Sequence, residues 1–143
     1  MRLTKFSEYA FRILIHLAVQ KDVRVSVEVL ASRYAISKHH VRKIVHYLSR
    51  DGYIRSVQGK GGGVCLKIKP EEINLAQLLV CNESDFYLAG CFNGDKNCTI
   101  DTVCELRGVL EQALVSFLSV LNQYTLADII KGKDDIWQKL EFH

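Results

Sequence analysis

The stretch from residue 26 to residue 69 constrains the fold of this chain more than any other part. Ser26 and Ser37 are preferred helix N-cap residues, and each precedes apolar residues at helical spacing, over 26–35 and 38–51. Two short segments of alternating character follow, on either side of a glycine cluster that can adopt the positive φ angles of a hairpin tip. Two helices and a hairpin in this order predict a winged helix-turn-helix. The expected fold class is therefore mainly α with a small β-hairpin wing.

The second of these helices is amphipathic and has a basic outer face opposite Val41, Ile44, Val45 and Leu48. In a helix-turn-helix protein this helix enters the major groove, where its first two turns reach base edges. The hairpin then touches phosphates or the minor groove. An ordinary amphipathic helix with a solvated charged face is the alternative. The candidate DNA-binding residues are Ser37, Lys38, His39, His40, Arg42, Lys43 and His46 on the helix, and Arg55 and Lys60 on the hairpin.

The second strand of the hairpin alternates, which places Val64, Leu66 and Ile68 inward and Cys65 on the outer side. The glycine cluster 59–63 could also be read as a phosphate-cradling loop. It lacks the spacing and the following helix of a P-loop, so a wing is the better interpretation.

Charge divides the chain into two parts. Residues 1–70 carry 14 Lys and Arg against 4 Asp and Glu, whereas residues 71–143 carry 5 against 12. This asymmetry predicts a polyanion-binding winged helix-turn-helix domain over 1–70 and a region with a different task over 71–143. Solvated surface charge is the alternative. Residues of the hydrophobic types make up 48% of the chain, but no apolar run is long enough for a membrane span or a secretory signal, so we expect a cytoplasmic protein.

The second region is expected to hold a long helix. Thr102 and Glu105 have the spacing of a capping box for a helix over about 103–123. This helix is too apolar to be covered on all sides by so short a chain, so one face should pack against a second copy. A homodimer would place two recognition helices about one DNA turn apart, which matches a palindromic operator. Three further caps are expected: Thr4 for a first helix over 4–20, Asn74 for one over 75–82, and Thr125 with Asp128 for a short one.

Three of the five cysteines, Cys91, Cys98 and Cys104, lie in a turn-rich stretch. In the cytoplasm such thiols are more often reduced or metal-bound than part of a disulfide framework. Their clustering indicates an iron–sulphur or zinc site, a thiol redox switch, or coincidence. Cys81 is expected to be a small buried residue.

The chain resembles the NsrR/IscR family of bacterial winged-helix regulators that carry an iron–sulphur cluster. The similar segments are MRLTKFSEYAFRILIHLA, YAISKHHVRKIVHYLSRDGYI, VQGKGGGVCL, the three-cysteine stretch and SFLSVLNQYTLADII. The resemblance implies three thiolate ligands from Cys91, Cys98 and Cys104, and a cluster that is 4Fe–4S more often than 2Fe–2S. It also implies a carboxylate ligand from the first helix of the partner subunit at the position of Glu8, where the family's usual residue is Asp.

Within this family, LNQYTLADII and the cysteine spacing are most similar to the members that respond to nitric oxide. The implied function is a repressor that leaves its operator when nitric oxide attacks the cluster. A regulator of iron or cluster assembly and a zinc- or thiol-switched repressor are the alternatives. We find no arrangement of nucleophile, base and orienting group, so an enzyme is not expected.

Overall fold

The computed structural model describes residues 2–20, 23–59, 61–83, 85–93, 99–100 and 104–141, and the structural statements below concern these residues. The elements are α1 (Lys5–Val19), α2 (Val27–Arg33), α3 (Lys38–Arg50), β1 (Ile54–Val57), β2 (Gly63–Leu66), η1 (Pro70–Glu72), α4 (Leu75–Asn82), η2 (Gly90–Asn93), α5 (Glu105–Asn122), α6 (Leu126–Ile129) and α7 (Lys133–Glu141). The mainly helical fold with one hairpin confirms the expected fold class.

The helices begin at the expected capping residues. Ser26 accepts a hydrogen bond from the N–H of Val29, and Ser37 accepts one from the N–H of His40, both at 3.2 Å. The caps predicted at Thr4, Asn74 and Thr125 are also present. The long helix differs, because α5 begins at Glu105 with Cys104 as its N-cap residue. Thr102, the cap predicted for it, lies outside the described residues.

The turn between α2 and α3 has a strained residue at its centre. Ala35 has a φ of +51°, the left-handed conformation that L-residues with a Cβ disfavour. Its N–H donates to the carbonyl of Ser32, and the N–H of Ile36 donates to the carbonyl of Ala31 at 2.9 Å. This pair of bonds is a Schellman motif, which ends α2 and reverses the chain into α3.

The wing is a two-stranded antiparallel hairpin that is tied to the rest of the domain. Ile54 pairs with Leu66 and Val57 with Gly63. Val64 also exchanges two backbone hydrogen bonds with Val25, at 2.8 and 2.9 Å. This bridge joins the hairpin to the segment between α1 and α2, and a Cβ on Gly63 would lie 2.8 Å from the Val25 carbonyl oxygen.

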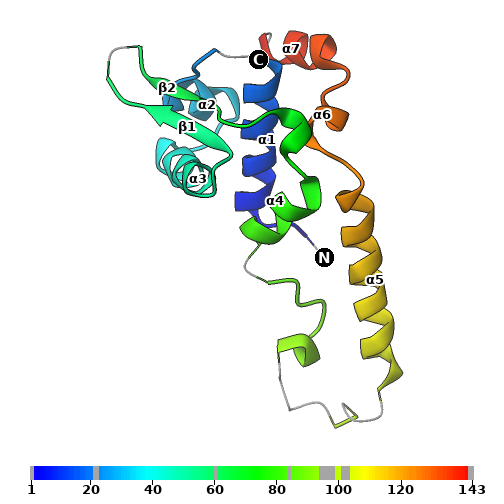
Figure 1. The fold of residues 1–143 in the computed structure, drawn as a ribbon. Coiled ribbons are helices and arrows are strands. Elements are labelled where there is room, and N and C mark those ends of the chain that lie inside the picture. The colour runs from blue at the N-terminus through cyan, green and yellow to red at the C-terminus, as the bar shows by residue number, and fades with distance from the viewer. Residues whose placement is uncertain are drawn as a thin grey trace.

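Helix α1 is the centre of the hydrophobic core (Figure 1). Helix α3, the hairpin, α4 and α6 surround it, so α1 touches both the helix-turn-helix with its hairpin and the C-terminal part. The core residues that these elements contribute include Ala10, Ile13, Leu14, Val41, Ile44, Leu48, Ile54, Val64, Leu78 and Leu126.

Helix α5 stands apart from this core. It runs as an arm beside the segment that follows α4 (Figure 1), and none of its residues is buried. Val115 on this helix is 67% exposed and Val109 is 60% exposed. The apolar face that the sequence predicted is therefore open in the single chain. No helix among the described residues could cross a membrane.

Two predictions about cysteines are wrong. Cys65 was expected on the outer side of the hairpin but is buried, because the side chain of its cross-strand partner Arg55 covers it. The Nε of Arg55 lies 3.0 Å from the Cys65 sulphur. Cys81 was expected to be buried but is exposed, since α4 packs through its neighbours Leu78 and Leu79 and the groove between α4 and α5 stays open.

Candidate DNA interface and metal-ligand residues

The outer face of α3 presents the predicted recognition residues together. Lys38, His39, His40, Arg42, Lys43 and His46 are all exposed, and Ser37 is exposed beside them. The opposite side of the helix is held in the core by Val41 and Ile44. The structure thus places these seven residues on one accessible surface, and their contacts with bases stay a prediction.

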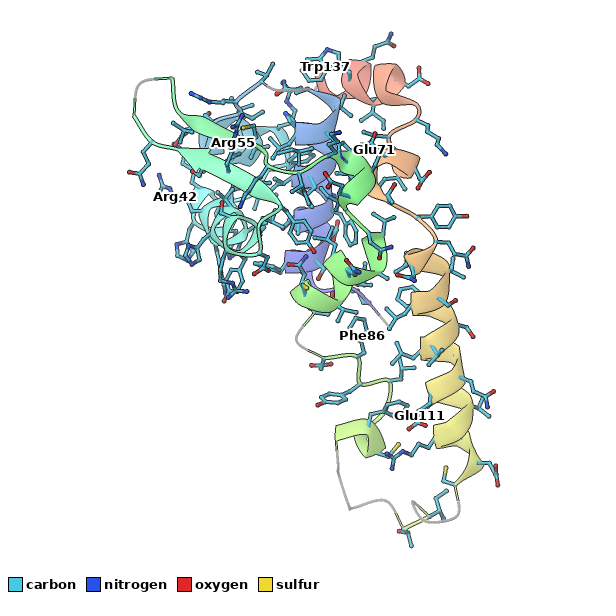
Figure 2. The ribbon with its side chains drawn as sticks, in the orientation of Figure 1. Arg42, Arg55, Glu71, Phe86, Glu111 and Trp137 are labelled. Atoms are coloured by element: carbon cyan, nitrogen blue, oxygen red, sulfur yellow. The ribbon has the colours of Figure 1, made fainter. Side chains whose placement is uncertain are left out.

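A groove of about 710 Å³ separates α3 from the wing. Arg42 and His46 line it from α3, and Ser56 lines it from β1. Figure 2 shows Arg42 on the side of α3 that is nearest the hairpin. Glu28 from α2 also lines the groove and lies 4.0 Å from Arg42 and 3.8 Å from Lys38. These exposed ion pairs are weak, so a phosphate can replace the carboxylate.

Of the two predicted wing residues, Arg55 is among the described residues and Lys60 is not. Arg55 is exposed on β1 and directs its Nε to Cys65. Since Ser56 lines the groove beside α3, the neighbouring Arg55 lies on the other face of the hairpin. Lys60 lies outside the described residues, between Gly59 and Gly61, whose positive φ angles make the hairpin tip.

Two of the three candidate thiol ligands are described. Cys91 lies in η2 and Cys104 caps α5, and both are half-buried free thiols. Cys98 lies outside the described residues. The structure gathers no group of three potential metal ligands among the residues that it describes. Free thiols that are partly accessible are of the ligand type that iron and zinc centres take.

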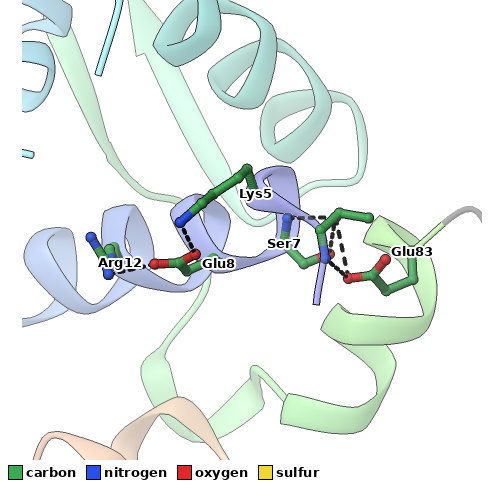
Figure 3. A network of polar contacts seen from close by, with 6 residues as sticks. Lys5, Ser7, Glu8, Arg12 and Glu83 are labelled. Carbon is green, nitrogen blue, oxygen red and sulfur yellow. Dashed lines mark hydrogen bonds and ion pairs between the residues drawn. The ribbon is translucent and has the colours of Figure 1, made fainter. Parts of the chain in front are cut away.

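Glu8 lies in the first turn of α1 between two cations (Figure 3). The Lys5 ammonium donates to Oε2 at 2.7 Å, and the Arg12 guanidinium donates to Oε1. The hydrogen bond from Lys5, followed by the charge of Arg12, holds the pKa of the Glu8 carboxyl below its ordinary value. The carboxylate is thus kept ionised, the form that binds metal, with its side chain 30% exposed.

A contact that the sequence did not predict joins α1 to the start of the segment that contains Cys91, Cys98 and Cys104, here called the cysteine segment. Glu83, just after α4, accepts a hydrogen bond from the Thr4 N–H at 2.9 Å and another from the Thr4 hydroxyl at 3.2 Å (Figure 3). Thr4 is the N-cap of α1. The residue that leads into the cysteine segment therefore holds the end of the helix that carries Glu8.

The same turn of α1 touches the recognition helix. The ring of Phe6 packs edge-on against the ring of Tyr47 in α3, with centroids 5.3 Å apart. The Arg50 guanidinium lies over the ring of Tyr47, 4.6 Å from its centroid. A continuous set of contacts thus runs from Glu83 through Thr4 and Phe6 to α3.

The chain resembles known regulators over its whole length. Residues 3–132 match the Rrf2 family, which is described as iron-dependent transcriptional regulators. The HTH-type transcriptional regulator NsrR of Bacillus subtilis is 40% identical over 99% of this chain and 98% of its own length. The NsrR of Bacillus licheniformis is 41% identical over 95% of this chain and 96% of its own.

Solved structures share the fold. IscR from T. potens superposes with a TM-score of 0.73 at 22% identity, over 92% of this chain and 88% of that one. Oxidised CymR from Staphylococcus aureus gives a TM-score of 0.73 at 20% identity, over 92% and 97%. The molecule thus shares the fold of these two solved structures.

The chain belongs to the Rrf2 family. It is a transcriptional regulator and not an enzyme, and among its relatives it is similar to the proteins named NsrR.

Proposed function

We propose that this regulator is a repressor that binds a palindromic operator as a homodimer and carries an iron–sulphur cluster, 4Fe–4S rather than 2Fe–2S, through which nitric oxide releases it from DNA. The observation that supports this most is the sequence identity of 40%, over 99% of the chain, to the NsrR of Bacillus subtilis. Cys91, Cys98 and Cys104 are the proposed thiolate ligands, and Glu8 of the partner subunit is the proposed fourth.

The donor set suits such a cluster chemically. Thiolates are the usual ligands of iron–sulphur clusters, and a single oxygen ligand leaves one iron more open to a small diatomic molecule. Glu8 is ionised and partly exposed, so it can exchange Lys5 and Arg12 for a metal without first losing a proton. Glu has one methylene more than the Asp usual in the family, which alters its reach.

The contacts of α1 suggest how the ligand site could act on DNA. Glu8 lies one turn from Thr4, which Glu83 holds, and beside Phe6, which packs on Tyr47 of the recognition helix. If Glu8 binds across the dimer, release of this ligand frees the end of α1 and relaxes the spacing of the two recognition helices. Two states that differ in this way give the effector a differential interaction to act through.

The experiment is a spectrum with iron, zinc and sulphide analysis of protein purified without oxygen, followed by operator binding before and after nitric oxide. We expect a brown protein whose affinity for DNA falls on adding nitric oxide and responds little to iron limitation. A colourless protein with one zinc per chain would overturn the cluster. A response to iron limitation but not to nitric oxide would instead identify a regulator of iron or cluster assembly.

A further inference from the structure

A second groove lies at the base of the hairpin, apart from the groove beside α3. It has a volume of about 720 Å³ and is bounded by the end of α1, the base of the hairpin, η1 and α6. It shares no lining residue with the groove beside α3. Arg55 of β1 lines this groove, whereas its neighbour Ser56 lines the other.

The floor of this groove is apolar. Leu17 of α1 and Leu66 of β2 form part of it, with Ile68 and Ile130 beside them. The last three are only half-buried, so apolar surface remains open to a ligand. Ligand pockets for small molecules have this character and lie in this range of volume.

The rim of the groove is basic. Lys67, Lys69 and Lys131 line it together with Arg55, which also contacts Cys65, and the acidic residue among the described lining residues is Glu71. Figure 2 shows Arg55 on β1 and Glu71 on η1. Lys131 pairs with Asp128 at 2.9 Å, but its side chain is 77% exposed, so this pair is weak and can open. The balance of charge at the rim therefore favours an anion.

We propose that this groove binds a small amphipathic anion, a molecule with a carboxylate or phosphate group on an apolar body. A bare phosphate would leave the floor of Leu66, Ile68 and Ile130 in water, and an uncharged apolar molecule would leave the basic rim unused. The groove joins the hairpin to α6, so an occupant touches both the DNA-binding part and the C-terminal part. Neither Cys91 nor Cys104 is among the described lining residues, so the proposed occupant does not require a cluster.

The test is calorimetric titration of the full chain with sodium decanoate, and with inorganic phosphate and decyltrimethylammonium as matched probes. Decanoate should bind at least tenfold more tightly than either. If phosphate bound as tightly as decanoate, the basic residues alone would account for binding. If decyltrimethylammonium bound as tightly as decanoate, binding would be apolar adsorption, for example on α5. Either result would overturn the proposal.

Two variants locate the site. Lys67→Glu with Lys131→Glu should weaken decanoate binding at least tenfold, whereas the control Arg24→Glu with Lys139→Glu, which makes the same change in charge at exposed residues that do not line the groove, should change it less than twofold. Ala127→Phe fills the groove and keeps every charge, and it should also weaken binding. Unchanged decanoate affinity in both Lys67→Glu with Lys131→Glu and Ala127→Phe would overturn the proposal. If these variants lost operator affinity but kept decanoate affinity, the groove would be assigned to DNA instead.

Discussion

The carboxylate of Glu83 and the N-cap residue Thr4 form two hydrogen bonds across 79 positions of sequence. Glu83→Ala should lower the free energy of unfolding by about 1 kcal/mol, the usual net value of such bonds. Urea denaturation measures this. If the contact also transmits the state of the cysteine segment, operator affinity of the cluster-loaded protein should fall more than that of the cluster-free protein.

Asp85→Ala is the matched control for this variant. Asp85 is also acidic and lies two residues further on, but among the described residues its carboxylate accepts from the nearby N–H of Tyr87 and not from Thr4. Equal effects of the two substitutions would mean that Glu83 acts through charge and not through Thr4.

Ala35→Gly should stabilise the fold by about 0.5–1 kcal/mol, because glycine adopts the left-handed conformation of this C′ position without the Cβ penalty. The exposed methyl group of Ala35 contributes little packing. Urea unfolding checks the sign. Ser32→Gly, inside α2, should instead destabilise, and a loss of stability in both variants would contradict the role assigned to Ala35.

His16 predicts a loss of stability in acid. Its Nδ1 lies 3.2 Å from the Tyr34 hydroxyl, which itself donates to the Arg12 carbonyl, so the Nδ1–H is the donor and Nε2 carries no proton. Nε2 is buried without a partner among the described residues. Burial and the charge of Arg33 lower the pKa of His16 to about 4.

The unfolded chain binds this proton near its ordinary pKa of 6.5, and the folded chain does not bind it until about pH 4. Stability should therefore fall as the pH decreases from about 6.5 to about 4, by up to about 3 kcal/mol from this group. His16→Asn, which keeps a donor and cannot titrate, should flatten the pH profile of urea unfolding. His46→Asn on the exposed face of α3 is the control, and equal slopes in all three proteins would refute the assignment.

Val115→Glu should break the proposed homodimer. Val115 is 67% exposed on α5, so the substitution leaves the single chain folded but buries a charge in the proposed interface. Sedimentation should show a monomer, and operator affinity should fall with it. The control is Lys139→Gln, which makes the same change in net charge at an exposed position of α7, away from α5. A dimer that survives Val115→Glu would exclude this face.

Lys60→Ala should weaken binding to all DNA sequences alike and lower the slope of log affinity against log salt by about 0.9, the value for one phosphate contact. Titrations of a labelled operator at several salt concentrations measure the slope. Lys139→Ala, a lysine exposed on α7, is the control. An unchanged slope for Lys60→Ala would remove this residue from the interface.

Local chemistry explains which parts of the fold the sequence predicts. Ser26 and Ser37 cap the neighbouring N–H groups whatever the rest of the chain does, so the helix starts were correct. Burial is decided by distant elements. Cys65 is buried because Arg55 of the opposite strand covers it, and alternation along one strand carries no information about that neighbour. The contact between Thr4 and Glu83 has no local signal at all.

The residues of the candidate sites also differ in how far the sequence alone predicts their placement. The exposed face of α3 follows from helical periodicity and was predicted residue by residue. The ligand role of Cys91 and Cys104 came from resemblance, and bringing thiols together is a matter of long-range folding that spacing alone does not determine.

The backbone bridge between Val25 and Val64 limits how this regulator can be switched. It ties the two-stranded hairpin to the segment between α1 and α2, so the wing cannot swing as a free flap while these helices stay in place. In the proposed homodimer, a signal would then have to move the whole helix-turn-helix and wing of one copy against those of the other. The controlled quantity would be the distance between these two rigid units, and operators with longer or shorter spacers would measure it.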